Sequence, residues 1–384
     1  MQMKCRFEVP LRSSRVFRRL VVTVTVFLKR ACNVGLTQSF AAFKLNRAGG
    51  AARIPAALLT SHIKRSTTIS EILGHVDANA ARLNAIHLSA TLTALAKLTN
   101  VSIQTSPRFQ NKLVMIVDRT LALLPTCNGR TLVNILWSLA KLHCNPGDVF
   151  LSVMVAEAEA KLPMLTSQEL ANSAWAFAKL GYNPGGAFLG ALVEDAKAKL
   201  PTFNCQAISN SLWALAKLDY YPGDRFLSEV VEESKAKLPL FNSQDLAISL
   251  WALATLCYNP GDAFLSAVVA EMSAKLPSFK SQNLANSLWS LAKFDYNPGD
   301  RFLWAVVKQS KTMLPWFNSQ ELANICWAFA RLHYHPGDAF LNALVKDAKS
   351  KLPSFSSQAM ANFLWSFATL AYNPDEAFLD AIAA

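Results

Sequence analysis

The chain has 384 residues, of which 52% are hydrophobic and 17% charged, so it can bury a large apolar core and is not an intrinsically disordered protein. Its apolar residues come in short blocks interrupted by Lys, Asn, Asp or Pro, and no run approaches the roughly 18 residues of a membrane-spanning helix. We therefore expect a soluble protein with no membrane partner. The seven scattered cysteines contain no C-x-x-C, which argues against a disulfide framework or a thiolate metal site and favours a reducing compartment.

The first 70 residues carry the whole net charge of +12, because they contain four Lys and nine Arg but only one acid, Glu8. Basic residues among Ser, Val and Phe are typical of an organelle transit peptide. Two other interpretations stay open: a solvated arm that touches nucleic acid, and a secretory h-region at Val21 to Leu28 that heads a bipartite plastid address. We expect a poorly ordered leader over residues 1–66 and a location in the mitochondrion or the chloroplast.

A repeat of 38 residues governs the chain after about residue 116. Pro recurs twelve residues before and nine residues after a repeated Trp, which divides each unit into two segments. Self-similarity at such a period is typical of a solenoid. The repeated tryptophans are Trp137, Trp175, Trp213, Trp251, Trp289, Trp327 and Trp365.

Both segments of the repeat have helical patterns. The first, as in Ser167 to Leu180, has apolar residues at helical spacing and a Ser as the expected N-cap. The second begins at an NPGD motif, where an Asp can cap the helix; these are Asp148, Asp224, Asp262, Asp300 and Asp338. The sequence therefore predicts an all-α fold, a right-handed α-solenoid of about seven helical hairpins.

The array is expected to cover residues 116–384, with a truncated last repeat. Upstream, residues 67–115 are expected to form a degenerate capping repeat. Its first helix would span His87 to Leu98, with Thr93 in the position of the repeated Trp.

Helical phase places three further rows within roughly 60° of the Trp: Gln seven residues before it, Asn three before it, and a cation four after it. The cations have no acid at i±4 in their own helix, so we predict that they contact RNA phosphates, with surface snorkelling as the alternative. This cation row consists of Lys141, Lys179, Lys217, Lys293 and Arg331, and is interrupted by Thr255 and Thr369. The acid–Lys pairs of the second helix, by contrast, predict a solvated face of little consequence.

Residues that read bases should differ between otherwise similar repeats. The position six before Trp varies in this way, and its neighbour two before Trp lies on the same side of the helix. We predict base specificity there, against the alternative that exposed positions simply drift. The first set is Thr131, Glu169, Ala207, Asp245, Asn283, Glu321 and Ala359; the second is Ile135, Ser173, Ser211, Ser249, Ser287, Ile325 and Phe363.

Two rows have a structural interpretation that we favour over contact with RNA. The recurring Asn can bridge adjacent hairpins through backbone hydrogen bonds, as an asparagine ladder. The Trp row lies at the edge of the apolar arc, where packing in the core is more common than stacking on bases.

The consensus LPxF-x-SQ-x-LANSLWALAKL-x-YNPGD-x-FL-x-A, repeated from Leu124 to Ala384, resembles the octotricopeptide repeat family and its relatives with FAST-kinase-type and RAP-type helical repeats. The resemblance implies a modular α-solenoid that binds organelle RNA and governs transcript stability, processing, splicing or translation. One departure is that the second helix opens with Pro260, Gly261, Asp262 and Phe264 where the family commonly has P-P-P-E-W.

Catalysis is not expected, because the sequence has no H-E-x-x-H, G-x-S-x-G or phosphate-binding glycine motif. We expect no catalytic residue, no metal site and no cofactor. The favoured hypothesis is an organelle protein that binds single-stranded RNA on its concave face in post-transcriptional control, with ribonucleoprotein partners. The alternative is a protein-interaction scaffold of the armadillo or TPR type.

Overall fold

The computed structural model describes residues 55–98 and 106–383, and in these residues helices alternate with short turns and no strand occurs. The prediction of an all-α solenoid is confirmed, since each repeat forms two helices that pack on the next repeat. Most of the predicted leader, residues 1–54, lies outside the described residues.

Each repeat contains a first helix, a second helix and a short 3-10 turn at the Leu-Pro motif. The first helices are α7 (Gly129–Lys141), α9 (Ser167–Leu180), α11 (Cys205–Lys217), α13 (Ser243–Thr255), α15 (Ser281–Lys293), α17 (Ser319–Arg331) and α19 (Ser357–Thr369). The second helices are α8 (Asp148–Glu159), α10 (Gly186–Ala198), α12 (Asp224–Lys237), α14 (Asp262–Lys275), α16 (Asp300–Met313), α18 (Asp338–Lys349) and α20 (Glu376–Ala383). The turns are η2 (Leu124–Thr126), η3 (Leu162–Met164), η4 (Leu200–Thr202), η5 (Leu238–Leu240), η6 (Leu276–Ser278), η7 (Leu314–Trp316) and η8 (Leu352–Ser354).

Further helices precede the regular repeats: α2 (Ala56–Arg65), α3 (Ile69–Ala78), η1 (Ala80–Arg82), α4 (Ala85–Leu98) and α6 (Pro107–Leu123). The predicted degenerate first helix is α4, which packs against α7 as one first helix packs against the next. The expected boundaries need correction at two places. Helix α2 falls inside the stretch assigned to the leader, yet it packs on α4 and buries Leu59 and Ile63. Helix α6 runs across the expected boundary at residues 115 and 116.

The first helices begin one residue earlier than expected. The N-cap of α9 is Thr166, whose side chain accepts from the backbone N–H of Glu169, and Ser167 is the first helical residue. Thr166 and Glu169 form a capping box, as do Asn242 and Asp245 in α13 and Asn318 and Glu321 in α17.

The second helices α8 to α18 are capped by glycine rather than by the predicted Asp. In α8 the N-cap is Gly147 at φ 88°, where an L side chain would be strained, and no side chain caps the helix. The Asn145 carboxamide oxygen accepts from the Gly147 N–H at 2.9 Å, which fixes the turn. Asp148 is the first helical residue, where its charge suits the helix dipole.

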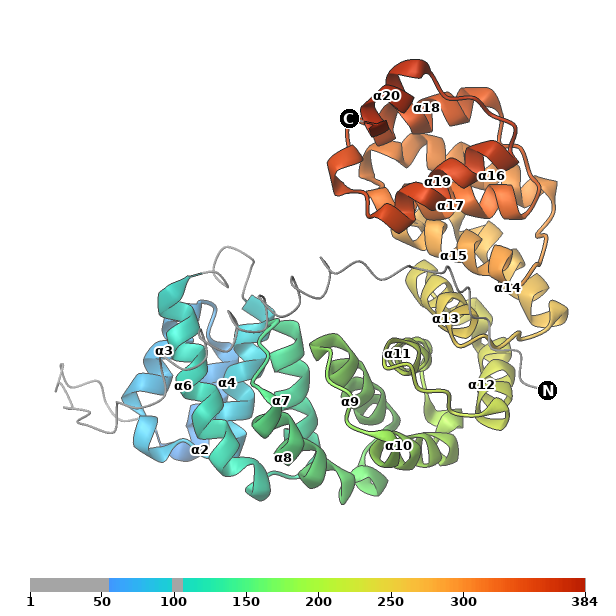
Figure 1. Cartoon of the computed structure of the whole chain (residues 1–384). Helices are drawn as coiled ribbons and strands as arrows, with labels where there is room; N and C mark the ends of the chain where they lie inside the picture. Colours follow the sequence, from blue (N-terminus) through green and yellow to red (C-terminus); the bar gives the residue numbers. More distant parts are fainter. Residues whose placement is uncertain (1–54, 99–105, 384) are drawn as a thin grey trace, which may run out of the picture. The chain divides into compact units, whose positions relative to one another are not determined.

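The first helices of successive repeats pack side by side in a row, while the second helices lie along one side of that row (Figure 1). The core lies between the two sets of helices. In the second repeat the rings of Phe177 in α9 and Phe188 in α10 pack edge to face, with their centroids 5.4 Å apart. Leu189 beside them is fully buried. Burial of each such side chain contributes roughly 1.5–3 kcal/mol, which is the main source of stability in the array.

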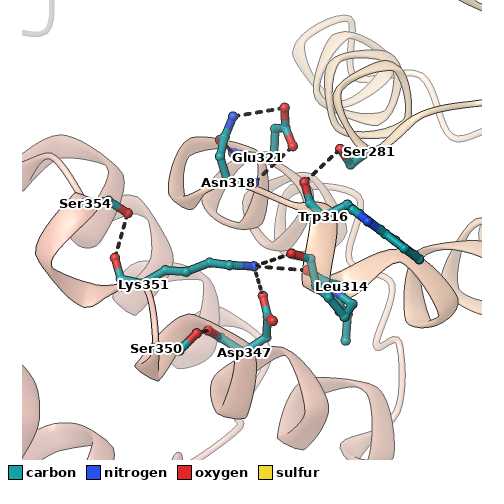
Figure 2. A network of polar contacts seen from close by, with 10 residues as sticks. Ser281, Leu314, Trp316, Asn318, Glu321, Asp347, Ser350, Lys351 and Ser354 are labelled. Atoms are coloured by element: carbon teal, nitrogen blue, oxygen red, sulfur yellow. Dashed lines mark hydrogen bonds and ion pairs between the residues drawn. The ribbon is translucent and has the colours of Figure 1, made fainter. Parts of the chain in front are cut away.

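The 3-10 turns are held from both sides by neighbouring repeats, as Figure 2 shows for η7. The Ser281 hydroxyl at the start of α15 donates to the Trp316 carbonyl at 3.3 Å. From the following repeat, Lys351 donates to the carbonyls of Leu314 and Pro315, both at 3.2 Å, and forms an ion pair with Asp347. The turn thus joins two successive repeats, since Ser281 belongs to the repeat of Trp289 and Lys351 to the repeat of Trp327.

The same lysine contact recurs along the array and corrects the prediction of a merely solvated face. These side chains, which we call the clamp lysines, donate to carbonyls of the preceding Leu-Pro turn. Lys237, for example, reaches Pro201 O at 3.0 Å and Phe203 O at 2.6 Å while it pairs with Glu233 at 2.7 Å. The clamp lysines are Lys199, Lys237, Lys275 and Lys351. Among the helices in the described ranges, none is long and apolar enough to cross a membrane.

Candidate nucleic-acid interface

A groove with a volume of about 790 Å³ runs over the first helices α9, α11, α13, α15, α17 and α19. Of its seventeen lining residues, sixteen belong to four positions of the repeat: seven before Trp, three before Trp, the Trp itself, and four after it. We call this surface the first-helix groove. Helical phase alone predicted that these four rows share one side of the helix, and side-by-side packing of the helices turns the rows into a continuous groove.

The five predicted phosphate contacts are all exposed, but they differ in their surroundings. Lys179 and Lys217 line the groove. The ammonium of Lys141 lies over the rings of Trp137 and Trp175, 5.8 and 5.4 Å from their centroids. Lys293 lies 5.8 Å from the Trp289 ring centroid. In the part of the chain that the structure describes, these four lysines form no ion pair with a carboxylate.

Arg331 is the exception in the cation row. Its guanidinium pairs with Asp295 at 2.7 Å, a partner that comes from the turn after α15 in the preceding repeat. Spacing within the helix does not reveal this partner, because Asp295 lies 36 residues before Arg331 in the chain. Arg331 is therefore neutralised locally, and the four lysines remain the available cations of the row.

The predicted base-specificity residues are not exposed, which corrects the premise behind that prediction. Six of them are at most 9% exposed: Thr131, Ala207, Asp245, Asn283, Glu321 and Ala359. Glu169 is half-buried and belongs to the capping box of α9. Among these residues only Asn283 lines the first-helix groove. Burial leaves most of them no free edge toward a ligand.

Asp245 shows what this row does instead. Its carboxylate completes the capping box of α13 and accepts from the Ser209 hydroxyl of α11 at 3.0 Å, so it joins two adjacent first helices. Burial raises the pKa of Asp245, against the opposite effect of its hydrogen bonds from Ser209 and Asn242. The residues two before Trp are also buried, and the hydroxyls of Ser249 and Ser287 have no hydrogen-bond partner.

The Asn and Gln rows line the groove, and the predicted asparagine ladder is wrong for the residues that the structure describes. The Gln168 amide donates to Asn172 at 3.1 Å, and Gln320 donates to Asn324 at 2.8 Å, each pair within one helix. No Asn of this row bonds to the backbone of a neighbouring hairpin in the described chain. Gln320 and Asn324 line the groove, so this pair presents hydrogen-bonding edges to a ligand there.

The Trp row is neither core nor free surface. Trp175 and Trp213 are half-buried, pack against the core and line the groove. Their ring centroids are 6.4 Å apart, and the angle between the ring planes is 34°. Trp289 and Trp327 repeat this geometry at 6.4 Å and 40°. Only Trp365 is markedly exposed, at 45%. Trp175, Trp213 and Trp251 thus both pack on the core and line the groove.

Metal and thiol chemistry find no support in the described ranges. No group of three His, Cys, Asp or Glu side chains there could hold a metal ion. Burial raises the pKa of the Cys326 thiol to about 12 and that of Cys127 to about 11, which keeps both protonated at neutral pH.

Comparison with protein families finds a similarity that covers most of the chain. A family model described as "Tbc2 translation factor, N-terminal domain" matches residues 75–294 and, a second time, residues 262–384. The two matches overlap because one helical repeat resembles the next, and together they run from α3 through the array. No curated protein matches the chain.

Proposed function

The chain belongs to the family of the Tbc2 translation factor N-terminal domain, and we propose that it is an RNA-binding protein of an organelle. It acts after transcription, in transcript stability, processing or translation, and holds single-stranded RNA in the first-helix groove. Three things support this: the family's name as a translation factor, the basic N-terminal 70 residues, and the groove itself. The repeat is of the octotricopeptide type, as its consensus suggests, and the compartment is the mitochondrion or the chloroplast.

The observation that carries the proposal is the composition of the groove. Most repeats place a Gln, an Asn, an indole and an exposed cation at these four positions; the exceptions are Arg130 for Gln, Ile248 for Asn, and Thr255 and Thr369 for the cation. Single-stranded RNA needs this combination, because its bases are free to stack and bond while its phosphates require cations. The Lys side chains that lie over Trp rings also keep an ammonium next to the surface on which a base would stack.

The four unpaired lysines test the proposal. Replacement of Lys141, Lys179, Lys217 and Lys293 by Glu should abolish binding of a fluorescent single-stranded RNA in an anisotropy titration. The wild-type affinity should fall with salt concentration, because each phosphate that a lysine neutralises releases counterions. The array should keep its helical circular dichroism, since all four side chains are exposed.

A matched control carries the same change in charge on the second helices, at the exposed Lys235, Lys311, Lys346 and Lys349. This variant should bind RNA nearly as well as the wild type. Equal loss in both variants would mean that only total charge matters, and absent or salt-independent binding by the wild type would refute the proposal. A protein partner recovered after nuclease treatment, without crosslinked RNA, would support the scaffold alternative instead.

A further inference from the structure

A second cavity, with a volume of about 640 Å³, lies where α2, α4 and α7 meet. We call it the N-terminal pocket. Three cations from three different helices line it: Lys64 of α2, Lys97 of α4 and Arg130 of α7. No carboxylate is among its lining residues. The first-helix groove, by comparison, gathers only two cations among its seventeen lining residues.

The pocket arises because α4 departs from the repeat at three of the four groove positions. Ile86 and Ala90 stand where the repeats have Gln and Asn, and Thr93 stands in place of Trp. Only the cation is retained, as Lys97. In α7, Arg130 replaces the usual Gln and adds a positive charge. The pocket thus lacks both the indole and the amide pair on α4, so it offers little to a base but much to an anion.

Thr93 also explains why this place is hollow. Its hydroxyl donates to the Ser89 carbonyl at 2.8 Å and lies 3.2 Å from the Ser138 hydroxyl of α7. This short polar contact joins α4 to α7 without the large ring that fills the same position in the regular repeats. The space that an indole would occupy is left to solvent or to a ligand.

The cations are available for a ligand. Lys64 and Lys97 are exposed and pair with no carboxylate among the described residues. The Arg130 side chain is 81% exposed, and its nearest acid, Glu169, is 4.0 Å away, at the limit of an ion pair. Such a surface pair contributes little and would not prevent Arg130 from binding a stronger anion.

The pocket's charge fits a terminal phosphate better than a phosphodiester. A terminal phosphate carries close to two negative charges at neutral pH and has three acceptor oxygens. A phosphodiester within a strand carries one charge, which single lysines along the groove can meet. We propose that the N-terminal pocket binds the terminal phosphate of the RNA that lies in the first-helix groove. This inference rests on the proposed function, and it gives the strand a fixed starting point on a groove whose rows are otherwise repeated.

The test compares three oligoribonucleotides of one sequence, each with an internal fluorophore: one with a 5′-phosphate, one with a 3′-phosphate, and one with hydroxyls at both ends. The full chain should bind one of the phosphorylated strands about tenfold more tightly than the hydroxyl-ended strand. Lys64→Gln with Lys97→Gln should remove that preference but leave binding of the hydroxyl-ended strand nearly unchanged. A control variant, Lys235→Gln with Lys346→Gln, should keep the preference.

If the wild type binds all three strands with equal affinity, the N-terminal pocket does not bind a terminal phosphate, while the groove proposal is unaffected. A preference that persists in the Lys64 and Lys97 variant would overturn the pocket proposal as well, since the phosphate would then bind elsewhere. Failure of the wild type to bind any of the strands would refute the proposed function itself. Unchanged circular dichroism and melting temperature of the variant establish that its fold is retained.

Discussion

At the scale of the residue, lysine serves two purposes in the repeat, and the second and third repeats contain both kinds: Lys179 with Lys199, and Lys217 with Lys237. The lysine four after Trp is exposed and carries no ion pair, whereas the clamp lysine twenty-four after Trp is half-buried and donates to carbonyls of the preceding Leu-Pro turn. In the sequence the clamp lysines look like ordinary i,i+4 partners of an acid. The carbonyls that bind them belong to a turn about 36 residues earlier, as with Lys237 and Pro201.

Replacement of Lys237 by Met should therefore destabilise the array by about 2 kcal/mol. The variant loses hydrogen bonds from a charged donor to Pro201 and Phe203, and it leaves Glu233 without its partner. The measurement is urea unfolding followed by circular dichroism at 222 nm.

The chain contains its own control for this experiment. In the fifth repeat the clamp position is Met313 and the acid position is Gln309, whose amide lies 3.4 Å from the Met313 sulfur. Combining Glu233→Gln with Lys237→Met should recover part of the lost stability, because no unpaired carboxylate remains. A double variant less stable than the single one would contradict this account.

At the scale of the element, the first helices are joined through the residues that begin them. Asp245 caps its own helix α13 and accepts from Ser209 of α11, and its neighbours in the same row are buried likewise. Sequence variation at this position therefore reflects how each pair of helices fits together. We infer that these residues act on stability more than on recognition.

The free energy of unfolding of the Asp245→Asn variant should increase relative to that of the wild type as the pH rises. Burial raises the pKa of Asp245 in the folded chain, so the folded state binds the proton more tightly than the unfolded state. Ionisation of Asp245 therefore lowers the stability of the wild type. This loss begins as the pH passes the ordinary pKa of about 3.9 and is complete once the pH exceeds the raised pKa of the folded state. Asn keeps the acceptor oxygen without that cost. Urea midpoints of both proteins from pH 3.5 to 8 measure the difference.

The converse substitution, Asn283→Asp, places a carboxylate at the same position of α15, where Asn283 is 7% exposed. Relative to the wild type, this variant should lose stability over the pH range in which Asp245→Asn gains it. A difference that does not change with pH in either variant would show that burial has little effect on these carboxyl groups.

At the scale of the whole array, the groove is nearly uniform. The variable positions are mostly buried, and the positions that line the groove repeat the same residues. The main departures lie in the fourth repeat, where Ile248 and Thr255 replace Asn and Lys. A surface that is the same at each step has little means of telling one base from another.

Oligoribonucleotides of different base composition but equal length and equal ends should therefore bind with affinities within about tenfold of each other. Competition titrations with oligo-A, oligo-U, oligo-C and a mixed sequence measure this. Ile248→Asn with Thr255→Lys should raise the affinity for all of them by a similar factor. A preference of a hundredfold for one sequence would show that the repeats do discriminate.

Much of the fold could be predicted from the sequence, because a strict period and helical spacing are local properties. The first helices, the second helices and the side of the helix that carries Gln, Asn, Trp and Lys follow from them. The caps could not be placed as well: Thr166 rather than Ser167 is the N-cap of α9, and Gly147 rather than Asp148 is the N-cap of α8. A helix can start at either of two adjacent residues, and the choice depends on backbone angles and on partners outside the helix.

By itself the sequence determined the repeat, its hairpin and the four rows that share one side of the first helix. Only the tertiary structure decided which polar residues are buried between helices, which lysines bind carbonyls, and that Arg331 is paired with Asp295. The reason is that burial and pairing depend on the neighbouring repeat, about 38 residues away in the chain. A single helix reveals its own faces, but not what will lie against them.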